Sequence, residues 1–148
     1  MGKNKKTQYD ARSTNSYSRK TGHRELKPGT REPLIVLSFK DLDLNQGQGF
    51  QDWEEENLLA LALNRLKELN QFTVKQALAQ KFVTQYTKVD FPPESDFYHP
   101  KHVPTGVEWC SMHVQGKECV IGYFEDNIFH IVFLDKNHRF WITEKKHT

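Results

Sequence analysis

The chain lacks the features that mark secreted, membrane and disulfide-rich proteins. Among its 148 residues no apolar run approaches the roughly 20 residues that cross a bilayer. The basic residues near the amino terminus precede no apolar stretch, so a secretory signal is not expected, and Lys6 stands where an N-myristoylation motif needs Ser or Thr. Two cysteines, Cys110 and Cys119, are too few for a disulfide framework. These absences favour a soluble protein of the reducing cytoplasm, without a membrane partner.

The chain also lacks the short motifs of several enzyme classes. It contains no glycine-rich loop that would cradle a phosphate and no nucleophile elbow. Glu54, Glu55 and Glu56 form an acidic triplet that resembles a set of catalytic carboxylates. Their expected position in the first turn of a helix explains them through the helix dipole instead.

The chain does have a strongly uneven charge distribution. Residues 1–31 contain nine Lys or Arg against two acidic residues, a net charge of +7, whereas residues 32–148 contain 12 basic and 17 acidic residues, a net charge of −5. Leu26 is the only aliphatic side chain larger than alanine in residues 1–31, so ordering them would cost roughly 1–2 kcal/mol per residue with little apolar burial in return. The sequence predicts a disordered basic arm, residues 1–31, suited to an anionic partner, and a single acidic domain, residues 32–148.

Two helices are expected in the first half of the domain. Asp52 has the pattern of an N-cap, with Glu55 three residues later. Leucines follow at helical spacing, namely Leu59, Leu63, Leu66 and Leu69. A second capping box at residues 73–76 should begin a short helix that runs to about Phe82. Because only a tight turn separates the two segments, they should form a helical hairpin.

Strands are expected at both ends of the domain. Residues 34–39 form a β-branched apolar run, and turn residues, including a hairpin turn at 115–118, separate the later apolar segments. Those later strands are expected at 109–114, 119–124 and 128–134, with a final edge strand at 140–142. The order β-α-α-β-β-β predicts an α+β domain in which the two-helix hairpin packs on a small, mostly antiparallel sheet. The neighbour of the first strand is left open.

Histidine and cysteine residues suggest two kinds of site. His99 and His102, followed by Cys110 and His113, have the spacing of zinc ligands. However, Cys110 and His113 lie three residues apart in an expected strand, so their side chains should point to opposite faces, and we expect no metal or cofactor. Cys119 begins an apolar run, where a buried thiol is expected to behave as a small hydrophobic group rather than as a nucleophile.

Residues 135–140 follow the most apolar expected strand and are strongly polar. His138 and Arg139 stand side by side there and would supply a proton-transfer group and a phosphate clamp. The alternative is that residues 135–137 form an ordinary turn and that His138 and Arg139 are its solvated exit.

The order of elements and the pattern of residues 120–124 and 128–135, followed by His138, resemble the RelE/ParE toxin superfamily over about residues 34–146. The resemblance implies a small sheet that cradles mRNA on the ribosome or binds a target protein, and a paired antitoxin that blocks the site. By position, His138 and Arg139 match the late basic pair of the ribonuclease members. Lys117 is the basic residue at the start of the strand that begins near Cys119.

The chain also departs from the family pattern. Glu118 and Cys119 stand where such ribonucleases often carry Arg, and Phe140 stands near a position where they carry a tyrosine hydroxyl. These departures concern the chemistry of the site more than the fold.

Three functions remain open from the sequence. The resemblance implies a toxin–antitoxin component that acts as an mRNA endoribonuclease, in which His138 moves a proton while Arg139 and Lys117 stabilise charge on the phosphate. The alternative is a non-catalytic accessory or interaction module that binds a protein or nucleoprotein partner, with the basic arm contacting nucleic acid. A third is an antitoxin or immunity subunit with an acidic masking surface. The expected partners are therefore RNA or the ribosome, and a cognate antitoxin or a larger protein.

Overall fold

The computed structural model describes residues 31–87 and 91–142. The chain divides into two units between Glu32 and Pro33, and the second unit, Pro33–Thr148, is described below. The predicted basic arm lies outside the described residues, apart from Arg31.

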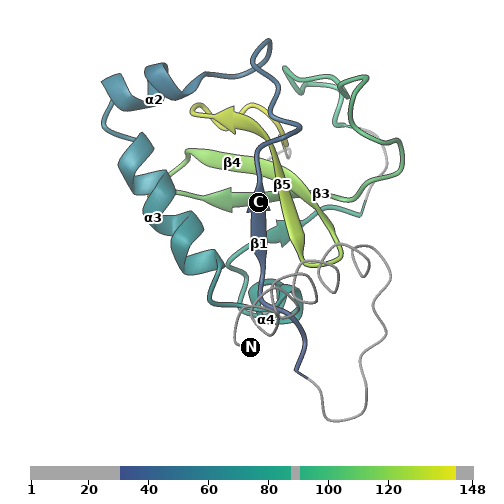
Figure 1. Cartoon of the computed structure of the whole chain (residues 1–148). Helices are drawn as coiled ribbons and strands as arrows, with labels where there is room; N and C mark the ends of the chain where they lie inside the picture. The colour runs from purple at the N-terminus through teal and green to yellow at the C-terminus, as the bar shows by residue number, and fades with distance from the viewer. Residues whose placement is uncertain (1–30, 88–90, 143–148) are drawn as a thin grey trace, which may run out of the picture. The chain divides into compact units, whose positions relative to one another are not determined.

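A five-stranded mixed sheet forms the centre of the unit (Figure 1). Its strands are β1 (Val36–Ser38), β2 (Thr84–Gln85), β3 (Trp109–His113), β4 (Cys119–Glu125) and β5 (Ile128–Asp135), in the spatial order β1-β5-β4-β3-β2. The pairs β2–β3, β3–β4 and β4–β5 are antiparallel, whereas β1 runs parallel to β5. The expected α+β class and mostly antiparallel sheet are confirmed, and β5 is the neighbour of the first strand.

The prediction of an edge strand at residues 140–142 is wrong. These residues pair with no strand, and β1 and β2 form the two edges of the sheet. The backbone N–H groups of Arg139 and Phe140 donate to the buried Asp135 carboxylate, at 3.0 and 2.8 Å, and this turns the chain back over the sheet. Phe140 is fully buried as a result, so apolar burial rather than strand pairing fixes its position.

Three helices, not two, connect β1 to β2: α2 (Phe50–Glu55), α3 (Leu59–Leu69) and α4 (Val74–Ala79). The expected first helix is interrupted at Asn57, whose φ is 60°. Leu58 N–H donates to the carbonyl of Trp53 and Asn57 N–H to that of Glu54, the two bonds of a Schellman motif. Asparagine adopts this left-handed conformation more readily than most residues, so it ends a helix here.

The helix caps differ in part from those expected. Gly49 is the N-cap of α2, and Asp52 is the third helical residue, whose carboxylate accepts the Gly49 N–H at 2.9 Å. The prediction of Asp52 as N-cap is therefore wrong by three residues. The capping box of α4 is confirmed, since the Thr73 hydroxyl accepts from Gln76 N–H and the Gln76 side chain accepts from Thr73 N–H.

These caps predict different costs for two substitutions. Thr73→Ala removes the acceptor of an N-cap and should lower the free energy of unfolding by ~0.5–2 kcal/mol, with Thr73→Ser restoring most of it. Asp52→Ala removes a charge near the helix amino terminus and the exposed hydrogen bond from Gly49 N–H, and should cost ~0.3–1 kcal/mol. Urea denaturation of the variants measures both values. A larger loss for Asp52→Ala than for Thr73→Ala would contradict this assignment.

The helices and one long connection cover opposite faces of the sheet (Figure 1). On the helix side, Leu58, Ala62, Leu66 and Leu69 are buried, whereas Leu63 is 49% exposed, so the buried face of α3 is rotated from the expected one. The connection between β2 and β3, together with Phe140 and Trp141, covers the other side with aromatic rings. No helix in the described part of the chain is long and apolar enough to cross a membrane.

Candidate functional site

The turn after β5 carries two of the predicted site residues and is fixed by one buried carboxylate. Asp135, the last residue of β5, is 2% exposed and accepts the backbone N–H groups of Arg139 and Phe140. His138 lies inside this turn with a φ of 58°, a left-handed backbone conformation that is uncommon for residues other than glycine but that histidine adopts more often than most. Asp135 therefore positions both His138 and Arg139.

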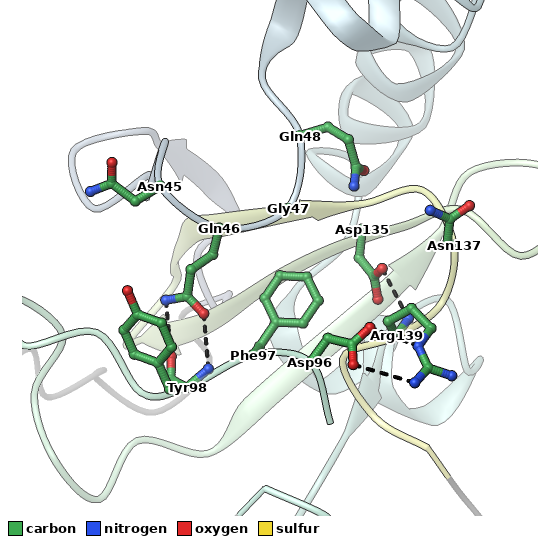
Figure 2. A pocket seen from close by; sticks show the side chains of 10 residues that line it. All are labelled: Asn45, Gln46, Gly47, Gln48, Asp96, Phe97, Tyr98, Asp135, Asn137 and Arg139. Carbon is green, nitrogen blue, oxygen red and sulfur yellow. Dashed lines mark hydrogen bonds and ion pairs between the residues drawn. The ribbon is translucent and has the colours of Figure 1, made fainter. Parts of the chain in front are cut away.

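The Arg139 side chain extends away from His138 toward the connection between β2 and β3. Its guanidinium forms a two-bond ion pair with Asp96, with distances of 2.8 Å from Nε and 3.3 Å from Nη2 (Figure 2). The hydrogen bond from Arg139 holds the pKa of the Asp96 carboxyl below its ordinary value. Arg139 thus has a carboxylate partner already, although the sequence predicted it as a phosphate clamp.

A pocket of about 340 Å³ lies beside this ion pair (Figure 2). Gln46 forms one wall, donating to the Tyr98 carbonyl at 3.1 Å and accepting from the Tyr98 N–H at 2.8 Å. The described lining residues include the carboxylates Asp96 and Asp135, and the only cation among them is the paired Arg139. Such a lining offers amide groups but no free positive charge, so it does not suit a phosphate.

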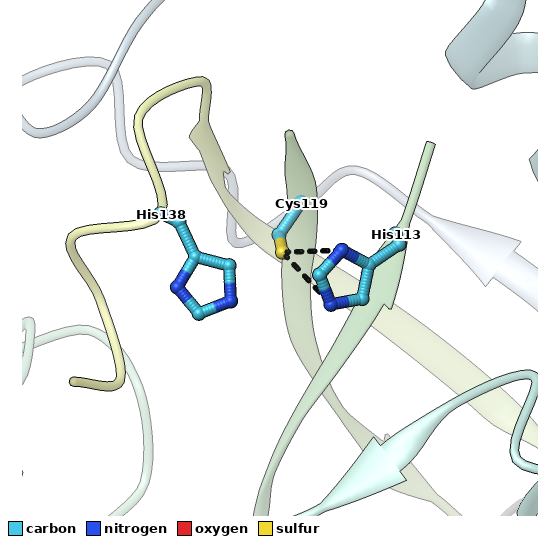
Figure 3. Close-up of side chains that lie close together, drawn as sticks. All are labelled: His113, Cys119 and His138. Atoms are coloured by element: carbon cyan, nitrogen blue, oxygen red, sulfur yellow. Dashed lines mark hydrogen bonds between the residues drawn. The ribbon is translucent and has the colours of Figure 1, made fainter. Parts of the chain in front are cut away.

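His138 joins a different cluster, at the end of the sheet where β3 stops and β4 starts. Figure 3 shows the Cys119 sulfur lying between the rings of His113 and His138. His113 is the last residue of β3 and pairs with Cys119, the first of β4, which in turn pairs with Asp135 of β5. One atom from each of the three side chains lies within 4.8 Å of the other two. The strand register therefore brings together residues from three separate segments.

A hydrogen bond decides the tautomer of His113. Its Nδ1 lies 2.7 Å from the carbonyl oxygen of Gly116 in the hairpin turn. A carbonyl only accepts, so Nδ1 carries a proton, and in the neutral ring the lone pair is on Nε2. The side chain is exposed, and its ring stacks on His138 with centroids 5.4 Å apart and an angle of 29° between the planes. The two imidazoles thus face each other at the protein surface.

Cys119 is a buried thiol rather than a nucleophile. It is 2% exposed, and its sulfur donates to the Lys117 carbonyl at 3.4 Å. Burial, with smaller contributions from Asp135 and Glu118, raises the pKa of the thiol to about 12. At neutral pH the group is protonated and only weakly nucleophilic.

This pKa predicts slow thiol labelling in the folded protein. The pKa of Cys110 is also raised to about 12, chiefly by burial, so both thiols should react with a disulfide reagent at pH 8 far more slowly than in denaturant. Above pH 9, the ordinary value, the unfolded thiols lose protons that the folded ones keep, so the free energy of unfolding should fall as pH rises. Equal labelling rates with and without denaturant would contradict the burial of both thiols.

Lys117, the third predicted site residue, lies in the turn between β3 and β4. Its side chain is exposed and its carbonyl accepts the Cys119 thiol. The structure therefore brings the backbone of Lys117 to the cluster that contains His138 and leaves the guanidinium of Arg139 on Asp96. The predicted catalytic roles of all three residues stay predictions.

The four residues with zinc-ligand spacing in the sequence do not form one cluster in the structure: His99, His102, Cys110 and His113. His99 and His102 bind backbone oxygens of Val103 and Asp41, at 3.0 and 2.7 Å. Cys110 packs in the core on the helix side of the sheet, away from His113, as the strand alternation predicted. His113 lies opposite Cys119 instead, a pairing that was not predicted from the sequence. The expected turn at residues 115–118 contained the signal, since a hairpin closed there places these two residues opposite each other.

A second polar cluster lies near the opposite end of β4 and β5. The Tyr123 hydroxyl donates to Asp41 at 2.5 Å, and the Tyr123 ring stacks on His130. Burial opposes ionisation of Asp41, but hydrogen bonds from Tyr123 and Lys40 outweigh it and lower the pKa of this carboxyl. Because Tyr123 and Asp41 satisfy each other, the cluster is explained as a structural tie between β4 and the segment after β1.

Comparisons of the chain with protein-family models, with curated proteins and with solved structures found no match.

Proposed function

We propose that the chain is a RelE-like endoribonuclease of a toxin–antitoxin system and that it cleaves RNA between His113 and His138. The observation that carries the proposal is the pair of facing imidazoles, 5.4 Å apart, at the surface of the sheet. One of them, His138, is the residue that the family resemblance predicts. The other, His113, comes from a distant strand and supplies the second proton-transfer group that this chemistry requires.

Two histidines are sufficient for the chemistry of RNA cleavage. The ribose 2′-oxygen attacks the adjacent phosphorus as one imidazole takes the hydroxyl proton. The bond from phosphorus to the 5′-oxygen breaks as the other imidazole donates a proton to that oxygen. The products are a 2′,3′-cyclic phosphate and a 5′-hydroxyl, with all protons accounted for. In the neutral His113 ring the lone pair needed for the first step is on Nε2, because Nδ1–H donates to Gly116.

The neighbouring residues support this assignment. Lys117 is exposed in the turn next to the cluster, where its ammonium would stabilise the negative charge that develops on the phosphate. Asp135 holds the turn that carries His138 and acts as a positioning residue. Arg139 belongs to the Asp96 ion pair and contributes to RNA docking only if that pair opens.

The experiment that tests this function uses the purified full chain and RNA, with and without ribosomes, in a chelating buffer. We expect cleavage products that end in a 2′,3′-cyclic phosphate, and growth arrest when the protein is expressed alone. Absence of both cleavage and growth arrest would contradict the ribonuclease function. Cleavage that leaves a 3′-hydroxyl would contradict the two-histidine mechanism.

A second candidate function is a non-catalytic interaction module. It is favoured by the exposed aromatic pair of Phe39 and Phe50, which are 42% and 40% exposed with ring centroids 5.8 Å apart, and by the net charge of −5 over residues 32–148. A docking partner would cover such rings. In that case the protein should bind RNA through residues 1–31 without cutting it, and the affinity should fall steeply with salt. If residues 32–148 alone bind RNA as tightly as the full chain, residues 1–31 do not carry the RNA binding.

A further inference from the structure

We propose that His113, Cys119 and His138 form a binding site for a zinc ion. The three side chains are the common nitrogen and sulfur ligands of Zn²⁺, and they come from the end of β3, the start of β4 and the turn after β5. The inference about binding stands on this geometry alone and does not depend on the ribonuclease function.

The distances fit a tetrahedral ion after small side-chain rotations. With Zn–S near 2.3 Å and Zn–N near 2.0–2.1 Å, the sulfur and nitrogen ligands of one zinc ion lie about 3.5 Å apart. Cys119 Sγ lies 3.7 Å from His113 Nδ1 and 3.9 Å from Nε2, and one ligand atom from each of the three side chains lies within 4.8 Å of the other two. His113 is exposed and His138 is half-buried, so both rings have room to turn toward the sulfur (Figure 3).

Neighbouring groups orient the two histidines and place negative charge near the cysteine sulfur. Histidines that bind metals usually donate their second ring N–H to a carbonyl or carboxylate, and His113 donates from Nδ1 to Gly116, which leaves Nε2 for the ion. Asp135 lies opposite Cys119 in the strand register and fixes the turn that presents His138. The carboxylates of Asp135 and Glu118 lie near the sulfur and complement a divalent cation.

A metal ion would also change the state of the cysteine. Burial keeps the Cys119 thiol protonated, but coordination to a divalent cation deprotonates a thiol outright. Binding should therefore release one proton from Cys119. Three protein ligands at a surface leave a fourth position for water.

A bound zinc ion would also affect RNA cleavage, and this consequence rests on the proposed ribonuclease function. The ion would occupy the imidazole nitrogens that otherwise exchange protons with the RNA. Zinc should therefore inhibit the ribonuclease, and a chelator should restore its activity.

Cobalt(II) serves as the spectroscopic probe for the test, because Co²⁺ occupies tetrahedral zinc sites. The untagged full chain should bind one equivalent of Co²⁺ with a thiolate-to-cobalt charge-transfer band in the near ultraviolet, and Zn²⁺ should displace it. Cys119→Ser should abolish this band, whereas Cys110→Ser, which alters the only other cysteine, should keep it. His138→Asn should weaken binding at least tenfold, whereas the matched control His102→Asn should not.

The outcomes separate the two proposals. A missing band in the folded wild-type protein, or an unchanged band in Cys119→Ser, would overturn the metal site. His138→Asn keeps the test decisive if Cys119→Ser does not fold, because asparagine tolerates the left-handed backbone at that position. If the protein binds metal but cleaves no RNA, only the ribonuclease proposal is contradicted. If it cleaves RNA and binds no metal, only the metal-site proposal is contradicted.

Discussion

RNA cleavage by the His138→Asn variant should be slower than that of the wild type by about 10²-fold or more, the scale usual for loss of a positioned general acid or base. Asparagine is chosen because the φ of 58° at this residue disfavours alanine, so the variant should fold normally. The measurement is a single-turnover cleavage rate on a defined RNA, with circular dichroism as the check on folding.

His113→Asn should slow cleavage by a similar factor, and the double variant should be little slower than either single one, because the two imidazoles act as a unit. The pH profile of the wild type should be bell-shaped, and each single variant should lose one limb. His102→Asn is the matched control, since this exposed histidine binds the Asp41 carbonyl outside the cluster. Full cleavage by His113→Asn would exclude the two-histidine mechanism.

The sequence and the structure predict different effects for the Arg139→Ala substitution. The sequence alone predicts that Arg139→Ala slows cleavage as much as loss of His138. In the structure its guanidinium is bound to Asp96, so we expect a smaller loss, shared by Asp96→Ala. A hundredfold loss for Arg139→Ala with full activity in Asp96→Ala would instead mean that the guanidinium leaves Asp96 to contact the phosphate.

Phe140→Ala should produce the largest loss of stability, about 3–5 kcal/mol in the free energy of unfolding, as for other buried aromatic residues. Phe140 is fully buried, and its ring lies 4.8 Å from that of Phe91 and 5.4 Å from that of Trp109, between centroids. Removing it leaves a cavity between the sheet and the segments that cover it. Urea denaturation measures the loss, and Leu63→Ala on the exposed side of α3 should cost about 0.5 kcal/mol or less.

Phe140→Tyr tests the family comparison at the same position. Restoring the tyrosine hydroxyl would place a polar group among aromatic rings, so we expect a loss of about 1–3 kcal/mol and no gain in cleavage. A stable and more active Phe140→Tyr variant would show that this side chain reaches the RNA, contrary to its burial.

Local sequence patterns determined most of the elements of this fold. The apolar runs at residues 109–114, 119–124 and 128–134 form β3, β4 and β5 because each is long enough for a strand and ends at turn residues. Thr73 and Gln76 begin α4 as expected because a capping box acts between residues close in sequence. The helix break at Asn57 was missed because a left-handed asparagine inside a leucine-rich segment leaves the helical pattern almost unchanged.

Only the tertiary structure decided how the candidate site is composed. The sequence pointed to His138, but the partners of this residue depend on the register of β3, β4 and β5, which places His113 opposite Cys119 and Cys119 opposite Asp135. The sequence also predicted one site for Arg139 and His138 because the two residues are adjacent. In the structure, Asp135 fixes a turn in which Arg139 binds Asp96 and His138 stacks on His113. Neighbours along the chain diverge in such a turn, and residues far apart meet across strands, because side-chain contacts follow backbone direction and register rather than sequence distance.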